Sequence, residues 1–503
     1  MKFDTKSIFI PHTAKTGIMQ KDLELDGTIP ESLPDVARLI SVDAKVGRTK
    51  IKVENGKAEV SADVVFGILY ESDYRAKASY TTSETEFVQK TDLECGKEFY
   101  PDADVKCAFL SCKLLGPRRF VIRARMATKL ECDSIEEVRT VDTDSTKVNA
   151  FFRTENAVFT TPCRTFTDER RVEGSASSPY PVSSVISVSA EAMKSEYSVS
   201  DGRLSVRTPI TVKALCEGED GKYFSVSASL PSLTTAEDTD IDDTKRFRIG
   251  VYASSPASSV ESDDYGEQKV LRFACDVFMD AVCYETVTEE LASDAFCADR
   301  SSECTVSAVD SGSVEEKKEK VISVEKTFDT ERTDISRVID TSAVFRVTET
   351  AVSDGKAEVK GVCTANVLVE DENGMSEISF ENEFAGELPV GDADDVCHAE
   401  IVPVDASSTV TGGENINFRS TAVISVFTLS AKKTACLSSV TASDSPEDRE
   451  ERGVCFYYPE KGETSWDIAK AYGTDPKRLA ENNESAFHPD GTLDENTVFV
   501  AIE

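Results

Sequence analysis

Few residues of this chain have the types and spacing that catalysis requires. Its 503 residues include only three histidines, His12, His398 and His488, so histidine-based catalysis and His-rich metal sites have few candidates. Cys397 precedes His398 and could form a nucleophilic pair with it, but no third residue can be identified to orient the base. We therefore expect a surface or hydrogen-bonded core histidine at this position, and no catalytic residue.

Sequence signals for metal, phosphate and sugar chemistry are equally weak. The acidic string Glu237–Asp243 has the composition of a calcium loop, but it lacks glycine at the sixth position and has Ile249 at the twelfth, where a bidentate glutamate is needed. No nucleotide-binding, zinc-protease or nucleophile-elbow motif occurs in a supporting context. Paired carboxylates for glycoside hydrolysis stay open in so acidic a chain, although nothing in the sequence singles out a pair. We expect a solvated acidic loop, no metal, no cofactor and no enzyme.

The cysteines and the N-terminus indicate the compartment. Fourteen cysteines occur without a C-x-x-C pair, and several, such as Cys216, Cys275 and Cys363, lie within apolar alternation. Disulfides or zinc are one interpretation, and reduced cysteines acting as small buried apolar residues are the one we favour. The N-terminus lacks the apolar core of a secretion signal, and no stretch is as long and apolar as a membrane span. We expect a cytosolic protein without membrane insertion.

The net charge argues against two classes of partner. Asp and Glu number 92 against 56 Lys and Arg, which gives a net charge of −36. Phosphate backbones and anionic lipid surfaces would repel such a chain. Hydrophobic residues make up 40% and charged residues 29%, which is typical of a globular protein. The composition favours a scaffold or binding protein that binds no nucleic acid.

One segment of the sequence recurs three times. The segments Asp35–Val60, Pro181–Val206 and Asp334–Val359 align without a gap. In each, a turn-forming pair stands at the same place; the pairs are Asn55-Gly56, Asp201-Gly202 and Asp354-Gly355. Such pairs between runs of alternating apolar and polar residues predict two-residue hairpins, because the turn needs positive φ at both central residues. Each copy also supplies a later long strand with one apolar face, which is typical of an antiparallel sheet.

The repeat therefore predicts a mainly β protein with three tandem antiparallel sandwich-like or barrel-like units of about 100 residues each. A string TF-x-x-ER is shared by the two stretches between the units, at 165–170 and 327–332, and it suggests that these connectors are ordered as a first edge strand. The expected division is an N-terminal extension 1–34, repeat one 35–140, a connector 141–180, repeat two 181–290, a connector 291–333, repeat three 334–441, a charged linker 442–453 and a different C-terminal module 454–503.

The C-terminal module breaks the all-β pattern. Val454–Tyr458 and Thr497–Ile502 read as short strands. Between them, Thr464 is a good cap for a first helix that Gly473 ends, and Thr474 or Asp475 caps a second. This PEKGETSWDIAKAYGTDPKRLAENNE segment resembles the LysM family. The matching positions are Gly462, Thr464, Trp466, Ile468, Ala469, Tyr472, Gly473, Leu479 and Asn482.

The LysM resemblance implies a small βααβ fold with a core and a groove. The implied core residues are Trp466, Ile468, Ala469 and Leu479. In LysM modules a glycan or partner groove lies between two loops, which here are Lys461–Ser465 and Asn482–Ala486. The implied binding residues are Lys461, Gly462, Glu463, Thr464, Ser465, Asn482, Asn483, Glu484 and Ser485. Helical periodicity favours Trp466 as core rather than sugar platform, and Asn482 could bind ligand or cap its helix.

The start of the first repeat adds a second resemblance. Ile29–Ile40, IPESLPDVARLI, resembles the opening string of SPOCS domains, the spore-coat-associated β domains of endospore-forming Firmicutes. Repeated SPOCS domains that end in a LysM module are similar to clostridial coat morphogenetic proteins. This resemblance implies a mother-cell protein at the forespore surface, whose LysM module docks a coat morphogenetic ATPase.

Two functions therefore stand as hypotheses. The first is a non-enzymatic structural adaptor of the endospore coat, with coat proteins as partners and with self-association through exposed strand edges. The alternative is a protein of the cell wall or spore cortex that binds peptidoglycan through N-acetylglucosamine glycan, which needs a route of export. A wall enzyme delivered by the LysM module would require a catalytic domain that the sequence does not reveal.

Overall fold

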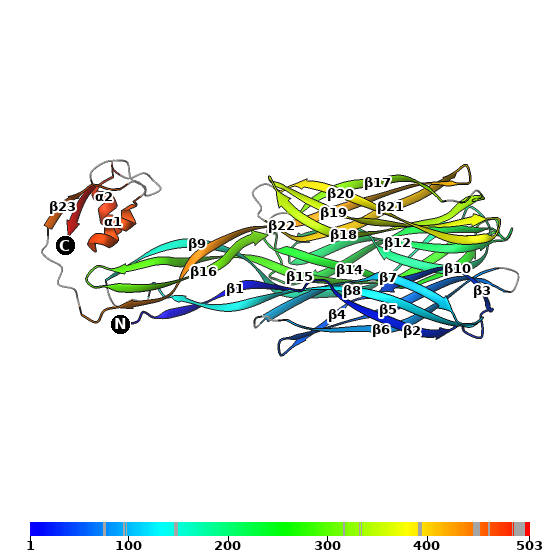
Figure 1. The fold of residues 1–503 in the computed structure, drawn as a ribbon, viewed down its shortest axis with the longest axis horizontal. Helices are drawn as coiled ribbons and strands as arrows, with labels where there is room; N and C mark the ends of the chain where they lie inside the picture. The colour runs from blue at the N-terminus through cyan, green and yellow to red at the C-terminus, as the bar shows by residue number, and fades with distance from the viewer. Residues whose placement is uncertain are drawn as a thin grey trace.

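The computed structural model describes residues 1–73, 77–93, 96, 98–144, 149–314, 317–330, 332, 334–390, 395–445, 453–460, 463–484, 486 and 498–502. This part of the chain contains 24 strands and two short helices, so the expected mainly β fold is confirmed. The strands build three lobes, a stalk and a small terminal module (Figure 1).

The first lobe consists of two facing sheets. In one, β5 pairs with β3, β4 and β6, and in the other, β8 pairs with β1, β2 and β7. The strand bounds are β1 Thr5–Lys15, β2 Met19–Thr28, β3 Val36–Val46, β4 Lys50–Glu54, β5 Lys57–Ser72, β6 Ala78–Asp92, β7 Glu98–Leu114 and β8 Arg119–Val141. Alternate apolar residues of β5 and β8, such as Phe66 and Ile122, meet between the sheets as the lobe core.

The second and third lobes repeat this plan. In the second lobe, β12 pairs with β10, β11 and β13, opposite a sheet of β14, β15 and β9; in the third, β19 pairs with β18 and β20, opposite β22, β17 and β21. The bounds are β9 Ala150–Ser177, β10 Val182–Ala192, β11 Glu196–Ser200, β12 Arg203–Gly218, β13 Tyr223–Glu237, β14 Arg246–Ser262, β15 Gln268–Cys297, β16 Ser302–Val314, β17 Lys318–Asp329, β18 Arg337–Ser353, β19 Lys356–Asp371, β20 Gly374–Pro389, β21 Asp395–Thr411 and β22 Asn415–Ala442.

The predicted hairpins are present in all three lobes. Both residues of each turn have positive φ; at Asn55 and Gly56 the angles are 51° and 73°, and the equivalent turns after β11 and β18 have nearly the same values. Because only residues that tolerate this backbone region fit such a turn, the hairpin register follows directly from the sequence.

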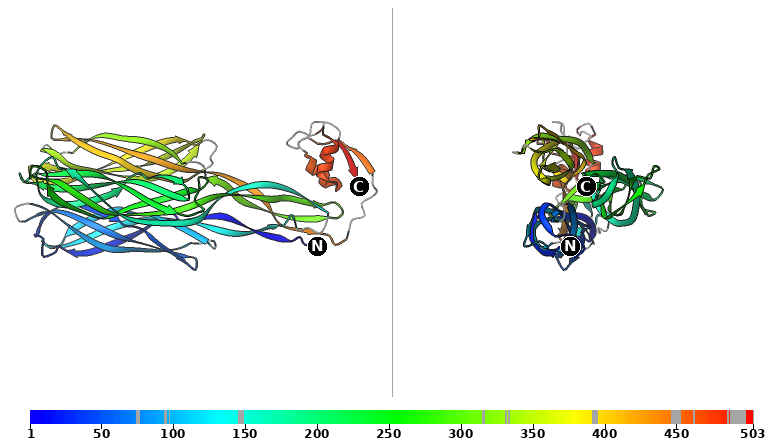
Figure 2. Two further views of the ribbon diagram at one scale, coloured as in Figure 1. Left: turned by 180° about the vertical axis from the view of Figure 1, so that it is seen from behind. Right: turned by 90° about the vertical axis from the view of Figure 1, so that its right-hand side faces the viewer.

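The three units are consecutive in sequence but lie side by side in space. Viewed along the long axis, the lobes surround a common centre (Figure 2, right). Equivalent leucines of the three repeats, Leu69, Leu215 and Leu368, are buried there in one cluster with Ile339 and Met375. The first sheet of each lobe is thus covered on both faces, by the lobe core and by its neighbours, which explains the nearly continuous apolar run of β5.

The expected N-terminal extension and the two connectors form strands of the lobes and of a stalk. The C-terminal halves of β8, β15 and β22 run past the lobes and pair with β1, the first half of β9 and β16. These three ribbons form the stalk (Figure 1). Its core takes residues from every ribbon, including Ile8, Phe159, Leu291, Val309 and Cys436. The first TF-x-x-ER string lies in β9, and the first three residues of the second, 327–329, end β17, so part of each connector does pair along a long strand of its lobe.

The C-terminal module follows the stalk. It contains β23 (Gly453–Tyr457), α1 (Ser465–Tyr472), α2 (Pro476–Asn482) and β24 (Val498–Ile502), and the two strands pair antiparallel. Most of the expected charged linker, 446–452, lies outside the described residues. Neither described helix has the length and apolar composition needed to cross a membrane.

Candidate functional site

Helix α1 of the module begins with reciprocal caps. The Thr464 hydroxyl accepts from the backbone N–H of Asp467, and the Asp467 carboxylate accepts from the backbone N–H of Thr464. Gly473 ends the helix in the left-handed region, with φ of 64°. These caps satisfy N–H groups that have no partner within the helix. The caps therefore define where α1 begins and ends.

The residues expected as the module core are buried together. Trp466, Ile468, Ala469 and Leu479 belong to one cluster with Val498 and Val500 of the closing strand. The cluster also includes Phe296, which belongs to β15 of the stalk. The core of the module and the tip of the stalk are thus continuous.

The first predicted binding loop is partly engaged within the module. Both carboxylate oxygens of Glu463 accept from the Tyr457 hydroxyl at 2.9 Å, and one accepts from the Glu460 backbone N–H at 2.7 Å. The hydrogen bond to this carboxylate raises the pKa of Tyr457 to about 12. Thr464 caps α1, and Ser465 is its first residue. Lys461 and Gly462 lie outside the described residues.

In the second predicted loop, one asparagine has a structural role. Asn483, not Asn482, caps α2. Its buried amide donates to the carbonyls of Leu479 and Phe499 at 2.8 and 2.7 Å and accepts from the Phe499 N–H at 2.7 Å. These bonds join the end of α2 to β24 and use both N–H donors of the amide, so the side chain has no donor left for a ligand. Asn482 and Glu484 are exposed, and Ser485 is not among the residues described.

One face of α1, which includes Trp466 and Lys470, contacts the tip of the stalk. The Trp466 indole Nε1 donates to Asp294 Oδ2 at 2.8 Å, and the Lys470 ammonium lies 2.7 Å from both Asp294 oxygens. Phe296 meets the Trp466 ring edge to face, with centroids 5.1 Å apart. Burial would raise the pKa of Asp294, but the bonds from Lys470 and Trp466 outweigh it and lower this pKa. Sequence reasoning missed Asp294, because nothing near it points to a residue 172 positions away.

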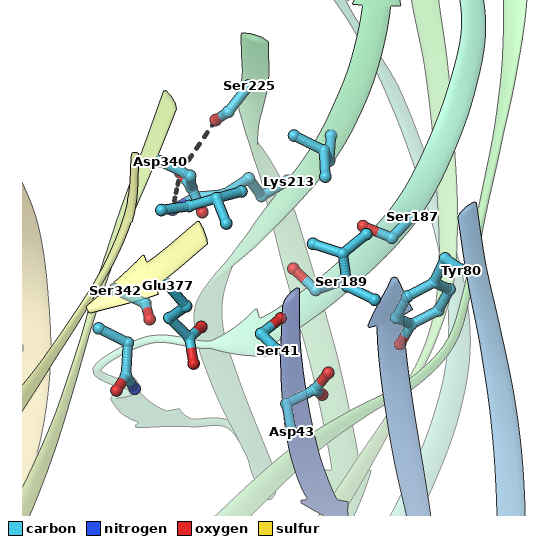
Figure 3. Close-up of a pocket in the computed structure, with 14 residues that line it drawn as sticks. Ser41, Asp43, Tyr80, Ser187, Ser189, Lys213, Ser225, Asp340, Ser342 and Glu377 are labelled. Atoms are coloured by element: carbon cyan, nitrogen blue, oxygen red, sulfur yellow. Dashed lines mark hydrogen bonds and ion pairs between the residues drawn. The ribbon is translucent and has the colours of Figure 1, made fainter. Parts of the chain in front are cut away.

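A polar cavity of about 130 Å³ lies where the three lobes meet. All three lobes contribute side chains to its lining. Two aligned positions of the repeats recur there, and their residues are labelled in Figure 3: Ser41, Ser187 and Asp340 at one, and Asp43, Ser189 and Ser342 at the other. The polar lining residues are Ser41, Asp43 and Tyr80 from the first repeat, Ser187, Ser189, Lys213 and Ser225 from the second, and Asp340, Ser342, Asn366 and Glu377 from the third. Because equivalent positions differ in chemistry, the near-threefold backbone carries an asymmetric set of charges.

One ion pair crosses this cavity. Lys213 Nζ lies 2.9 Å from Asp340 Oδ1, and the Ser225 hydroxyl donates to the same carboxylate at 3.0 Å (Figure 3). Burial raises the pKa of Asp43. Burial, together with the nearby carboxylates of Asp43 and Asp340, raises the pKa of Glu377 to about 7. The junction between the lobes thus contains acids that burial makes harder to ionise.

Comparison with known families identifies the first lobe. Residues 35–114 match the family model described as SipL, SPOCS domain. The chain carries a SPOCS domain. The matched segment runs through β3, β4, β5, β6 and β7, so it includes the sheet that faces the cavity. This SPOCS domain indicates a role related to sporulation and the spore coat, in agreement with the resemblance at Ile29–Ile40.

The remaining comparisons found no relative, and the described residues show no metal site. A search of curated proteins and a search of solved structures each found no match. Within the described ranges, no group of three or more His, Cys, Asp or Glu side chains is arranged to hold a metal ion. The twelve cysteines with described side chains are free thiols. The side chains of Cys397 and His398 lie outside the described part.

Proposed function

We propose that this chain is a non-enzymatic structural adaptor in endospore coat assembly. Its SPOCS lobes recruit or assemble coat proteins at one end, and its C-terminal module, a LysM module by its sequence, docks a coat morphogenetic ATPase at the other. The protein would act in the mother cell at the forespore surface. The SPOCS match supports the coat assignment, and the arrangement of the lobes and stalk supports the adaptor role.

The observation that carries the proposal is the fusion of three lobes into one elongated body. The lobes share an axial cluster of buried leucines, and the stalk takes its core from strands of all three repeats. Such shared cores resist separation of the lobes, because pulling one away exposes apolar surface of its neighbours. The module lies at the far end of the stalk from the lobes (Figure 1). A rigid body with two separated ends suits a protein that links two partners.

The surface charge supports recruitment rather than nonspecific adhesion. A net charge of −36 keeps free copies apart by mutual repulsion. Assembly then requires a specific partner at one end to raise the local concentration of lobes. Exposed strand edges of the concentrated lobes can pair with other coat proteins by strand addition.

A pull-down from lysate of sporulating cells tests this function. The bait is the full chain, compared with a chain that ends at Ser443, and bound proteins are identified by mass spectrometry. We expect a coat ATPase with the full chain alone and other coat proteins with both baits. Capture of peptidoglycan fragments by the full chain, with no coat protein on either bait, would overturn the proposal in favour of glycan binding.

A further inference from the structure

Asp294 has three different partners at the tip of the stalk. Its carboxylate accepts from the Trp466 indole and the Lys470 ammonium, both on α1, and from the backbone N–H of Ala295 at 2.8 Å. The bond from Ala295 orients the carboxylate toward the helix. Charged acceptors make stronger hydrogen bonds than neutral ones, so a single side chain of the stalk holds two side chains of the module.

Phe296 completes this contact with an apolar surface. Residues two apart on a strand face the same side, so Phe296 lies beside Asp294 toward α1. Its ring packs against Trp466 on one side and against Phe151 of β9, at 5.3 Å between centroids, on the other. Phe296 is itself buried in the module core. The stalk thus offers an acidic residue and an aromatic residue that match the donors and the ring of α1.

We propose that Asp294 and Phe296 form an intramolecular latch that holds the module on the stalk tip and keeps the α1 face closed. In the closed state, the side chains that could bind another protein through this face, Trp466 and Lys470, are occupied by the chain itself. A competing partner must supply the same chemistry, which is a carboxylate for the two donors and a ring for the indole. The latch stands on the contacts alone, whereas its role in controlling the docking of a coat protein rests on the proposed function.

The latch predicts how the ratio of closed to open molecules changes when the Asp294 carboxylate is removed. Loss of the carboxylate leaves the indole N–H and the ammonium without their acceptor. Hydrogen bonds to charged groups contribute enough that their loss shifts the ratio of closed to open molecules by roughly tenfold or more. Opening of the module then exposes the indole ring to solvent.

The experiment uses the single tryptophan of the chain as a reporter. Trp466 is the only tryptophan, so the emission maximum and acrylamide quenching of the full-length, folded protein report on the surroundings of this one indole. The variants are Asp294→Ala and Asp294→Asn, which removes the charge but keeps an acceptor. We expect emission to shift to longer wavelength and quenching to increase in the order wild type, Asp294→Asn, Asp294→Ala.

The same strand provides a matched control. Asp276 of β15 pairs with Arg171 at 2.8 Å, and its side chain is 28% exposed, against 29% for Asp294. Asp276→Ala therefore removes a comparable ion pair far from the module, and its tryptophan signal should equal that of the wild type. Far-UV circular dichroism shows whether each variant is folded. If Asp294→Ala misfolds, the emission and quenching of Asp294→Asn and Lys470→Ala test the latch instead. Folded variants with wild-type emission and quenching overturn the latch.

A second readout separates the latch from the proposed function. If both are correct, Asp294→Ala should capture more of the coat ATPase than the wild type in the pull-down. If the fluorescence changes as expected while neither protein captures coat components, the latch stands and the adaptor function fails. If the wild type captures the ATPase but the fluorescence of folded latch variants does not change, the adaptor stands and the latch fails.

Discussion

Lys213 of the second lobe and Asp340 of the third lie 2.9 Å apart, Nζ to Oδ1, in the cavity where the three lobes meet. The lysine also donates to the backbone carbonyl of Thr341 at 2.9 Å. The equivalent of Lys213 is Gly67 in the first repeat and Asn366 in the third, so only one of the three positions supplies a cation. This pair therefore joins two particular lobes and gives the pseudo-symmetric assembly a defined arrangement.

We expect Lys213→Ala to destabilise the protein. The substitution leaves the Asp340 carboxylate without its cation in a partly buried cavity, which costs about 1–3 kcal/mol in the free energy of unfolding. Denaturant unfolding measures the change. Lys222→Ala is the control from the same lobe, because its ion pair with Asp220 is much more exposed, and exposed pairs contribute little to stability. If both variants lost the same free energy of unfolding, the Lys213–Asp340 pair would contribute no more than an exposed ion pair.

The raised pKa of Glu377 predicts a pH-dependent stability. Burial first, and then the carboxylates of Asp43 and Asp340, raise this pKa from 4.5 to about 7. The folded state therefore binds the proton more tightly than the unfolded state, so stability falls as pH rises from about 4.5 to 7 and stays lower above it. The whole effect is at most about 3 kcal/mol. Thermal unfolding of the wild type and of Glu377→Gln from about pH 4 to about pH 9, which brackets the pKa values of the unfolded and folded states, measures it.

Glu377→Gln should be the more stable protein above pH 7 and should show a weaker fall across the range. Glu387 provides the control, because it lies on the same strand but is exposed and paired with Lys356. Glu387→Gln should keep the wild-type slope. A wild-type slope in Glu377→Gln would place the titration elsewhere in the protein.

The shared leucine cluster predicts that damage to the axis affects the whole assembly. Leu215→Ala removes a side chain that is 7% exposed from a core built by three lobes. Large-to-small changes at such positions cost about 2–4 kcal/mol in the free energy of unfolding. Leu233, 47% exposed in the same lobe, gives a control whose change to alanine should cost within about 0.5 kcal/mol. Calorimetry that finds the same melting temperature for both variants contradicts a shared core.

Alanine substitutions at the neighbouring residues Asn483 and Asn482 should have very different effects on the stability of the module. Asn483→Ala breaks one hydrogen bond to Leu479 of α2 and two to Phe499 of β24 and leaves buried backbone groups unpaired, at a cost of about 1–3 kcal/mol. Asn482→Ala changes an exposed residue and should cost little. Denaturant unfolding followed by Trp466 fluorescence reports on the module itself. A wild-type midpoint for Asn483→Ala would favour a binding role for its amide over a structural one.

Local features of the fold could be predicted from the sequence because short segments encode them. The Asn55-Gly56 turn follows from the backbone angles that its two residues tolerate, and the start of α1 follows from a threonine cap three residues before an aspartate. Alternation of apolar and polar residues has the period of a strand wherever the strand lies. The candidate site residues Trp466, Ile468 and Leu479 were identifiable in the same way, from helical spacing and a family pattern.

The sequence by itself determined the three repeats, their hairpins, the SPOCS opening string and the two capped helices. Only the tertiary structure decided that the repeats surround one axis, that the expected connectors become stalk strands, and that Asp294 meets Trp466. The reason is physical. Turns and caps depend on the backbone preferences of neighbouring residues, whereas the axis and the latch depend on the burial and pairing of side chains more than a hundred positions apart. Such pairs form only once the lobes have packed, since no local pattern selects one distant partner over another.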